Sequence, residues 1–282
     1  GKQNEVEEYT ALLVNIKEAF INEYTTRNGS LVSNSQTAYV LALNFDMLPE
    51  NLREQAAKRL ADNIRSYNYH LTTGFLGTPY LCHVLTRFGY HDLAYTLLMQ
   101  KSYPSWLYPV TQGATTIWER WDGQKPNGDF QTISMNSFNH YAYGAIGDWM
   151  YKTLGGINSS SKTDGVGYKK IILKPHVDNK LVSKKEEEQS EDERLTMVNT
   201  DLDTYYGKIS SHWQKGDNQF SMDFNIPVNT TAELHIPTNA IEKIMEGKSK
   251  LSKSKDITII ETTATEVIVS LGSGAYHFTI KK

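Results

Sequence analysis

The chain has 282 residues, of which 39% are hydrophobic and 22% charged, and its formal net charge is −3 at pH 7. This length allows one large domain or two ordinary ones, and the composition excludes a disordered or collagen-like chain. The charge balance argues against a nucleic-acid partner, and no run of 18 apolar residues offers a membrane span. The one cysteine, Cys82, excludes an internal disulfide. Because the chain begins at Gly1 without an initiator methionine, we treat it as part of a longer protein.

The first half of the chain has the periodicity of helices. Residues 5–24 place apolar side chains at a spacing near 3.6, and residues 37–45 are nearly all apolar, which predicts a helix buried on most sides. Residues 50–67 instead predict a one-sided, solvent-facing helix. Further helices are predicted over residues 77–88, 91–99 and 135–154. Since buried and exposed helices alternate, we expect antiparallel helix pairs in two concentric layers.

The second half has the pattern of strands. Residues 155–167 are rich in Gly, Ser and Asp and lack periodicity, so we expect a helical domain over residues 1–157 and a β-domain over residues 158–282. Strands are predicted over residues 169–173, 207–213, 219–226, 232–236, 257–260, 266–271 and 275–280. Together they predict an antiparallel β-sandwich. The charged run at 183–194 is predicted to be a solvated loop.

The most unusual segment is YPSWLYPVTQGATTIWERWD, at residues 103–122. It holds three of the five tryptophans, and its two prolines and Gly113 prevent a continuous helix. Glu119 lies between Trp118 and Trp121. Apolar faces of sugars pack on indole rings and a carboxylate handles protons, so this segment suits a sugar site. The spacing is equally consistent with core tryptophans and a surface acid.

A second candidate segment is SMNSFNHYAY, at residues 134–143. Asn136 or Ser137 would cap the helix predicted to follow, which places His140 in its first turn and off the apolar stripe. Gly144 falls on the same side as His140, so a ligand or a neighbouring helix approaches that face closely. From spacing alone, His140 is as consistent with a hydrogen-bonded structural residue as with a ligand contact.

Several segments in order are similar to one known family. They are QTAYVLAL (36–43), TTGFLGTPYLCHVL (72–85), YPSWLYPVTQGATTIWERWDG (103–123), SFNHYAYGAIGDWMY (137–151), GYKKIILKP (167–175), YYGKISSHW (205–213), IPVNTTAELHIP (226–237) and SGAYHF (273–278). With these segments the chain resembles the C-terminal part of bacterial α-L-rhamnosidases of glycoside hydrolase family 78.

The resemblance implies an α+β two-domain chain, with about half of an (α/α)6 barrel followed by a β-sandwich. It also implies hydrolysis of terminal α-L-rhamnose with inversion. The T-x-W-E-R-W motif places the general base on Glu119, and the S-F-N-H-Y motif places a sugar contact on His140. Trp106 and Trp121 are expected to flank the rhamnose. No metal and no other cofactor is required, and the expected partner is a rhamnose-containing glycan or glycoside, with no nucleic acid and no membrane.

The sequence departs from the family in one respect. Family members carry the general acid in a D-E-R-x-G-W motif, which this sequence lacks. Inversion needs an acid as well as a base, so we expect this chain to supply the base and to be inactive alone. The alternatives are another (α/α)6 glycosidase or phosphorylase, or a non-catalytic carbohydrate-binding or structural fragment. Half a barrel would expose apolar helices such as residues 37–45, which predicts a homodimer through these helices.

Overall fold

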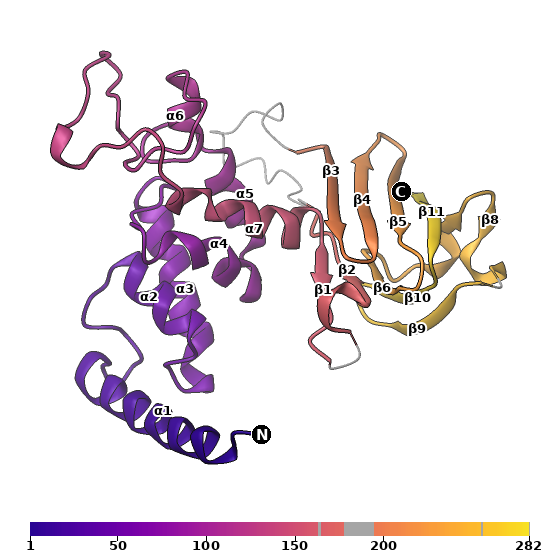
Figure 1. Cartoon of the computed structure of the whole chain (residues 1–282), viewed down its shortest axis with the longest axis horizontal. Helices are drawn as coiled ribbons and strands as arrows, with labels where there is room; N and C mark the ends of the chain where they lie inside the picture. The colour runs from indigo at the N-terminus through magenta and orange to yellow at the C-terminus, as the bar shows by residue number, and fades with distance from the viewer. Residues whose placement is uncertain (163–164, 178–194, 255, 282) are drawn as a thin grey trace. The chain divides into compact units, whose positions relative to one another are not determined.

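A computed structural model describes residues 1–162, 165–177, 195–254 and 256–281 (Figure 1). Its contacts divide the chain into two compact units, Gly1–Ile146 and Gly147–Lys282, the first helical and the second built from β-sheets. The predicted α+β class is thereby confirmed, while the domain boundary at 157/158 stays a prediction. The charged run at 183–194 lies outside the described residues. Within the described residues, no helix is both long and apolar enough to cross a membrane.

Six α-helices lie within the first unit, and the last of them lies inside the candidate segment 103–122. They are α1 (Gln3–Tyr24), α2 (Gln36–Asn44), α3 (Glu50–Ser66), α4 (Thr78–Arg87), α5 (His91–Met99) and the short α6 (Leu107–Thr111). Contacts link α2 to α3 and α4, and link α4 to α5. The first five helices match the predicted ranges, and α6 was not predicted because Pro109 lies inside it.

The burial of α2 and α3 follows their sequence patterns. The Ser35 hydroxyl caps α2 by accepting a hydrogen bond from the Ala38 N–H at 3.2 Å. Tyr39 and Leu43 in α2 are fully buried, as the apolar composition predicts. The expectation that half a barrel exposes the apolar residues 37–45 is therefore wrong for most of this helix, because α3 and α4 pack against it. In α3 only one side is buried, through Leu60, Ile64 and neighbouring alanines, which confirms the one-sided pattern.

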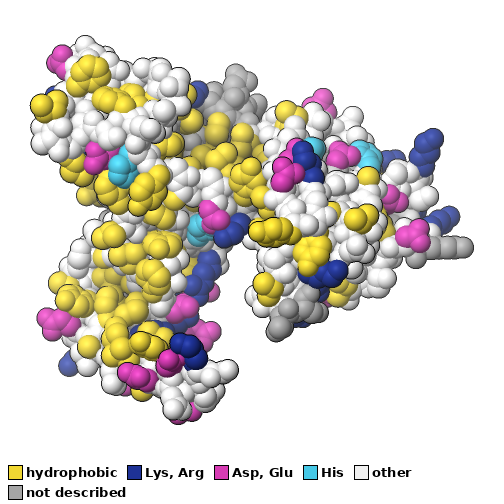
Figure 2. All heavy atoms as spheres, in the orientation of Figure 1, with side chains coloured by type: hydrophobic (Ala, Val, Ile, Leu, Met, Phe, Trp, Pro, Cys, Tyr) yellow, Lys and Arg dark blue, Asp and Glu magenta, His cyan; other side chains and the backbone are white. Residues whose placement is uncertain are grey.

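Helix α1 has a different environment. None of its 22 residues is buried, although Leu12, Leu13 and Ile16 are large apolar residues about half exposed. Figure 2 shows hydrophobic side chains gathered over the region of α1 and α2. A groove of about 360 Å³ lies there, lined mainly by apolar residues from Phe20 in α1 to Met47 after α2. This face of the unit is therefore apolar and exposed to solvent.

The helix predicted over residues 135–154 is confirmed in its second part and wrong in its first. A 3-10 turn covers Ile133–Met135, and the chain is irregular from residue 136 to 141. Residues 142–154 are helical, as a 3-10 turn (Ala142–Ala145), α7 (Ile146–Trp149) and a π-helical turn (Met150–Leu154). The physical reason is a competing hydrogen-bond partner. The backbone at Ser137 and His140 bonds to the segment around Glu119, which leaves it unavailable for helical bonds.

The second unit contains two β-sheets. The first has the order β1-β2-β6-β10-β9, and the second has the order β3-β4-β5-β11-β7-β8. The strands are β1 (Ile157–Ser159), β2 (Lys170–Leu173), β3 (Met197–Thr204), β4 (Gly207–Lys215), β5 (Gln219–Ile226), β6 (Thr231–Ile236), β7 (Ile244–Glu246), β8 (Ser249–Lys250), β9 (Thr258–Thr262), β10 (Val267–Leu271) and β11 (Gly274–Lys281). All pairs are antiparallel except β2 with β6, which is parallel.

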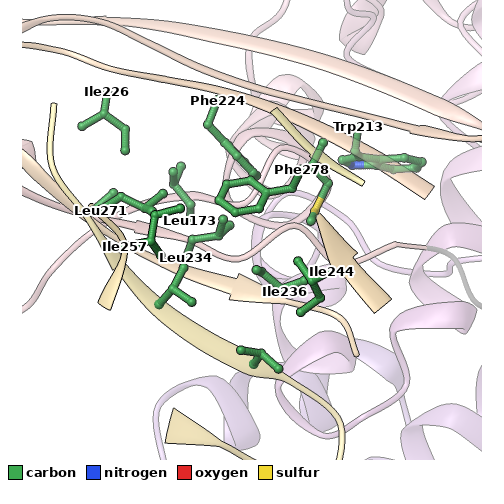
Figure 3. Packing of buried hydrophobic residues seen from close by; sticks show 14 of the residues in the cluster. Leu173, Trp213, Phe224, Ile226, Leu234, Ile236, Ile244, Ile257, Leu271 and Phe278 are labelled. Atoms are coloured by element: carbon green, nitrogen blue, oxygen red, sulfur yellow. The ribbon is translucent and has the colours of Figure 1, made fainter. Parts of the chain in front are cut away.

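The two sheets share one apolar core, as expected for a sandwich. Figure 3 shows Trp213 and Phe224 from one sheet gathered with Leu234 and Ile236 from the other. The alternation that predicted β5 is visible in its burial, since Met222, Phe224 and Ile226 are buried. The Trp213 indole N–H donates to the Leu154 carbonyl at 2.8 Å, so the one polar atom of this buried ring is satisfied.

An ion-pair network covers part of the outer face of the first sheet. Lys174 Nζ lies 2.7 Å from Glu266 Oε1, and His235 Nδ1 lies 2.7 Å from Glu266 Oε2. His235 Nε2 is also 3.4 Å from Glu233, which pairs with Lys170 at 3.2 Å. Burial alone would raise the pKa of Glu266, but the hydrogen bonds from Lys174 and His235 outweigh it and hold that pKa below its usual 4.5.

Replacing Glu266 is therefore expected to change how stability depends on pH. A carboxyl whose pKa is lowered by folding stabilises the fold above its unfolded-state pKa, and this stabilisation is lost as the pH falls through the folded-state pKa. We expect Glu266→Gln to lower the free energy of unfolding by about 1 kcal/mol at pH 7, the size of a hydrogen bond to a partly screened charge. The difference from wild type should shrink below pH 4.5. Urea unfolding of both proteins across pH 3–8 measures this, with the exposed Glu242→Gln as control. A difference independent of pH would contradict the assignment.

Candidate functional site

Two segments that are distant in sequence pair with each other around Glu119. The Glu119 N–H donates to the Ser137 carbonyl at 2.9 Å, and the Ser137 N–H donates to Glu119 Oε2 at 2.8 Å. Three residues further on, the His140 N–H donates to the Ile117 carbonyl at 2.8 Å. These bonds bring the two segments predicted to carry chemistry into direct contact. They also hold one oxygen of the Glu119 carboxylate in a fixed position.

The second feature of the site is a stack of aromatic rings. The Trp121 indole lies flat on the Tyr143 ring, with centroids 3.8 Å apart and planes 7° apart. Trp106 meets Trp121 edge-on at 5.6 Å, and its own indole N–H donates to the Tyr143 carbonyl at 3.0 Å. The Trp121 indole N–H points to the Thr73 carbonyl, with a nitrogen–oxygen distance of 3.4 Å. Contacts with Tyr143, Trp106 and the Thr73 carbonyl therefore hold the Trp121 ring.

Glu119, Trp121 and Tyr143 line a cavity of about 280 Å³. Its lining residues are Gly74, Phe75, Tyr103, Glu119, Arg120, Trp121, Asp122, Met135 and Tyr143. Glu119 and Trp121, both predicted from the sequence, therefore share one cavity. A volume of this size holds a single small ring compound, and an aromatic wall beside a carboxylate is typical of sugar sites.

His140 and Trp106 lie close to the stacked rings of Trp121 and Tyr143, which we call the aromatic wall. Neither residue lines the cavity. The His140 imidazole is half-buried and stacks on Phe75, with centroids 4.9 Å apart and planes 14° apart. The Ala142 N–H donates to His140 Nδ1 at 3.3 Å, so the neutral ring carries its proton on Nε2. Trp106 is 8% exposed and lies behind Trp121.

Electrostatics keep the Tyr143 hydroxyl neutral. Burial raises the pKa of Tyr143 to about 12. Tyr103 and the carboxylates of Glu119 and Asp122 act in the same direction, and Arg120 opposes them. Arg120 Nε is 3.5 Å from Asp122 Oδ1, so part of its charge is compensated within the site. A neutral Tyr143 remains a hydrogen-bond donor throughout the physiological pH range.

Three residues of the cavity were not predicted as site residues: Phe75, Tyr103 and Tyr143. Phe75 and Tyr143 lie far from Glu119 in the chain and reach it only through the fold, so spacing carried no signal for either. Arg120 and Asp122, which flank Trp121, also line the cavity. Trp118 is 6% exposed and packs edge-on against Phe138 at 5.0 Å, in agreement with the core alternative. Within the described residues, no group of three or more His, Cys, Asp or Glu side chains is placed to hold a metal ion.

Comparison with known families assigns both units. Residues 1–154 match the family described as bacterial alpha-L-rhamnosidase 6 hairpin glycosidase domain, and residues 156–251 match the bacterial alpha-L-rhamnosidase C-terminal domain. The chain belongs to the bacterial α-L-rhamnosidase family. Its helical unit is thus a portion of a six-hairpin glycosidase domain, as the resemblance implied.

Individual relatives agree with this assignment. The chain is 38% identical to an alpha-L-rhamnosidase of Formosa agariphila, over 100% of the chain and 28% of the relative. It is 37% identical to one of Streptomyces avermitilis, over 96% of the chain and 24% of the relative. The crystal structure of a Streptomyces avermitilis alpha-L-rhamnosidase complexed with L-rhamnose superposes with a TM-score of 0.84 at 36% identity, covering 98% of the chain and 24% of that structure. The chain therefore spans about a quarter of the length of these relatives.

Proposed function

We propose that this chain forms one wall of the active site of an inverting α-L-rhamnosidase and that Glu119 is the general base. The observation that carries the proposal is the position of the Glu119 carboxylate. It lines the aromatic cavity while one of its oxygens is fixed by the Ser137 N–H. A base that must orient one water molecule needs such a fixed carboxylate.

The proposed reaction is a single displacement. Ionised Glu119 takes a proton from a water on the face of the sugar opposite the leaving group, and the water oxygen forms a bond to C1. At the same time the bond from C1 to the glycosidic oxygen breaks, and a general acid protonates that oxygen. We place the acid outside this chain, because the chain lacks the family's acidic motif and spans only a quarter of its relatives.

The surrounding residues have separate roles in this proposal. The apolar face of rhamnose, formed by its C–H groups, packs on Trp121 beside Tyr143, since apolar sugar faces favour contact with aromatic rings. Trp106 contributes indirectly, because it lies behind Trp121 and holds the wall in place. His140, with its proton on Nε2, donates a hydrogen bond to a ring hydroxyl.

Replacement of Glu119 tests the base directly. In the longer protein that carries this chain, we expect Glu119→Gln to lower kcat for an aryl α-L-rhamnoside by about 10²–10⁴-fold, the usual contribution of general base catalysis. Azide, which attacks without needing a base, should restore turnover and give the β-linked rhamnosyl azide. The matched control is Glu54→Gln on the exposed side of α3. Near-normal activity of Glu119→Gln would contradict the proposal and support the alternative in which Glu119 is a surface acid.

The missing acid leads to a second expectation. The purified 282-residue chain should hydrolyse aryl α-L-rhamnosides at least 10²-fold more slowly than the longer protein, because no proton reaches the leaving oxygen. Initial rates at equal molar concentration measure this, with and without phosphate to detect a phosphorylase. Turnover by the chain equal to that of the longer protein would place both catalytic groups in this chain.

We further propose that the isolated chain forms a homodimer through the apolar face of α1 and the groove beside α2. That face exposes Leu12 and Ile16, each at 48%, and large exposed apolar surfaces favour association. Light scattering of the purified chain should give twice the monomer mass of 32.0 kDa, and Ile16→Glu should return the monomer. The control is Glu8→Lys, an exposed charge reversal on the same helix. A wild-type chain that is monomeric at high micromolar concentration would overturn the proposal.

A further inference from the structure

The Gln36 side chain, at the first position of α2, is fully buried and bound at both ends of its amide. Gln36 Nε2 donates to the His70 carbonyl at 3.1 Å, and the Thr72 N–H donates to Gln36 Oε1 at 2.8 Å. The amide therefore pairs with the backbone of residues 70–72 as a neighbouring strand would. A buried amide with both ends satisfied holds that backbone firmly, since losing either bond leaves an unpaired polar group.

The segment held in this way has no regular structure of its own. Residues 70–74 form neither helix nor strand, and they lie between α3 and α4. Leu71 and Thr73 are buried on either side of Thr72. Within this segment the bonds to Gln36 take the place of the backbone pairing that a helix or strand would provide.

The Thr73 carbonyl connects this segment to the cavity wall, because it accepts the indole N–H of Trp121 at 3.4 Å. The Thr78 hydroxyl in α4 donates to the same carbonyl at 3.3 Å. Gly74 and Phe75, which come next, both line the cavity. The position of the segment therefore affects both Trp121 and Phe75 in the lining of the cavity.

The same segment also affects His140. Phe75 stacks on the His140 imidazole at 4.9 Å and contacts the Tyr143 ring at 5.3 Å. A Cβ at Gly77 would lie 2.9 Å from Thr73 Cγ2 and 3.0 Å from the Thr37 hydroxyl, so α2, α4 and the segment are in close contact. Because the packing around Gly77 leaves no free space, a shift of residues 70–74 would displace the aromatic rings next to them.

We propose that Gln36 is a positioning residue for the sugar site: its amide sets the backbone of residues 70–75, and that backbone sets Trp121 and Phe75. This inference rests on the proposed function, because it assigns the sugar-binding wall to these rings. Gln36 does not touch the cavity, so its effect is on the fit of the sugar and not on the chemistry of Glu119. Its loss should therefore raise KM more than it lowers kcat.

The isosteric variant Gln36→Glu gives a test that depends on pH. A protonated carboxyl offers an O–H donor to His70 and a carbonyl acceptor to Thr72, which reproduces both bonds of the amide. An ionised carboxylate has no donor and faces the His70 carbonyl with a negative charge. Burial raises the pKa of the introduced carboxyl above its usual value of about 4.3, so the two forms can be compared within an accessible pH range.

We expect the KM of Gln36→Glu in the longer protein, divided by that of wild type at the same pH, to be within about twofold of 1 at pH 5. At pH 8 the ratio should rise to about tenfold, the effect of one lost buried hydrogen bond, with kcat within about threefold of wild type. Dividing by wild type removes the titration of the catalytic groups. The matched control is Gln219→Glu on the exposed part of β5, whose ratio should stay near 1. A ratio for Gln36→Glu that does not change with pH would overturn the proposal.

A spectroscopic measurement separates positioning from general stability. In ¹⁵N-labelled 282-residue chain, the indole N–H resonance of Trp121 should shift in Gln36→Glu at pH 8 and return at pH 5. The Trp213 indole, bonded to Leu154 in the other unit, is the internal control and should not move. An unmoved Trp121 resonance would overturn the proposal. If the longer wild-type protein showed no rhamnoside turnover, the proposed function would fail, and this spectrum would still test whether Gln36 positions Trp121.

The variant Gln36→Met covers the case in which the ionised glutamate unfolds the protein. Methionine has a similar length and makes neither hydrogen bond, so the KM ratio should be about tenfold at pH 5 and at pH 8 alike. A folded Gln36→Met with wild-type KM would overturn the proposal.

Discussion

The reciprocal hydrogen bonds between Glu119 and Ser137 determine the arrangement of the whole site. The backbone N–H of each residue donates to the other, once to a carbonyl and once to a carboxylate oxygen. This pairing keeps residues 136–141 out of a helix and holds them against the segment of Glu119. A charge-assisted bond of this kind is stronger than a neutral one and fixes the carboxylate rotamer.

Some residues of the site line the cavity, and others hold those residues in position. Trp121 and Tyr143 stack on each other and both line the cavity, and Trp106 packs against Trp121 with its ring plane nearly perpendicular. Their positions depend on groups at some distance in the sequence, above all the Thr73 carbonyl and the Gln36 amide beneath it. A stacked wall positioned in this way pays little entropy when a sugar binds, because its rings have few alternative orientations.

Much of the fold could be predicted from the sequence, because its patterns are local. The apolar run at residues 37–45 is sufficient to predict a buried helix. The alternation at residues 219–226 is sufficient to predict a strand of a sandwich. Strand β3 (Met197–Thr204) was not predicted because Asn199, Asp201 and Asp203 disfavour strands, and its stability comes from its pairing with β4. The helix predicted over residues 135–154 was wrong over residues 136–141 for a similar reason, since the backbone there bonds to a segment distant in sequence.

The site was only partly predictable. The carboxylate between two tryptophans indicated Glu119, whereas its contact with the segment of His140 depends on hydrogen bonds 18 to 23 residues apart in sequence. Phe75 and Gln36 have no distinguishing pattern in the sequence, and their relation to Trp121 exists only in three dimensions. A crystal structure of the longer protein with bound L-rhamnose tests the proposed role of Glu119 most directly. We expect the sugar to lie on the Trp121 ring, with a Glu119 carboxylate oxygen one water molecule from C1. A sugar bound in another cavity, or a C1 turned away from Glu119, would contradict it.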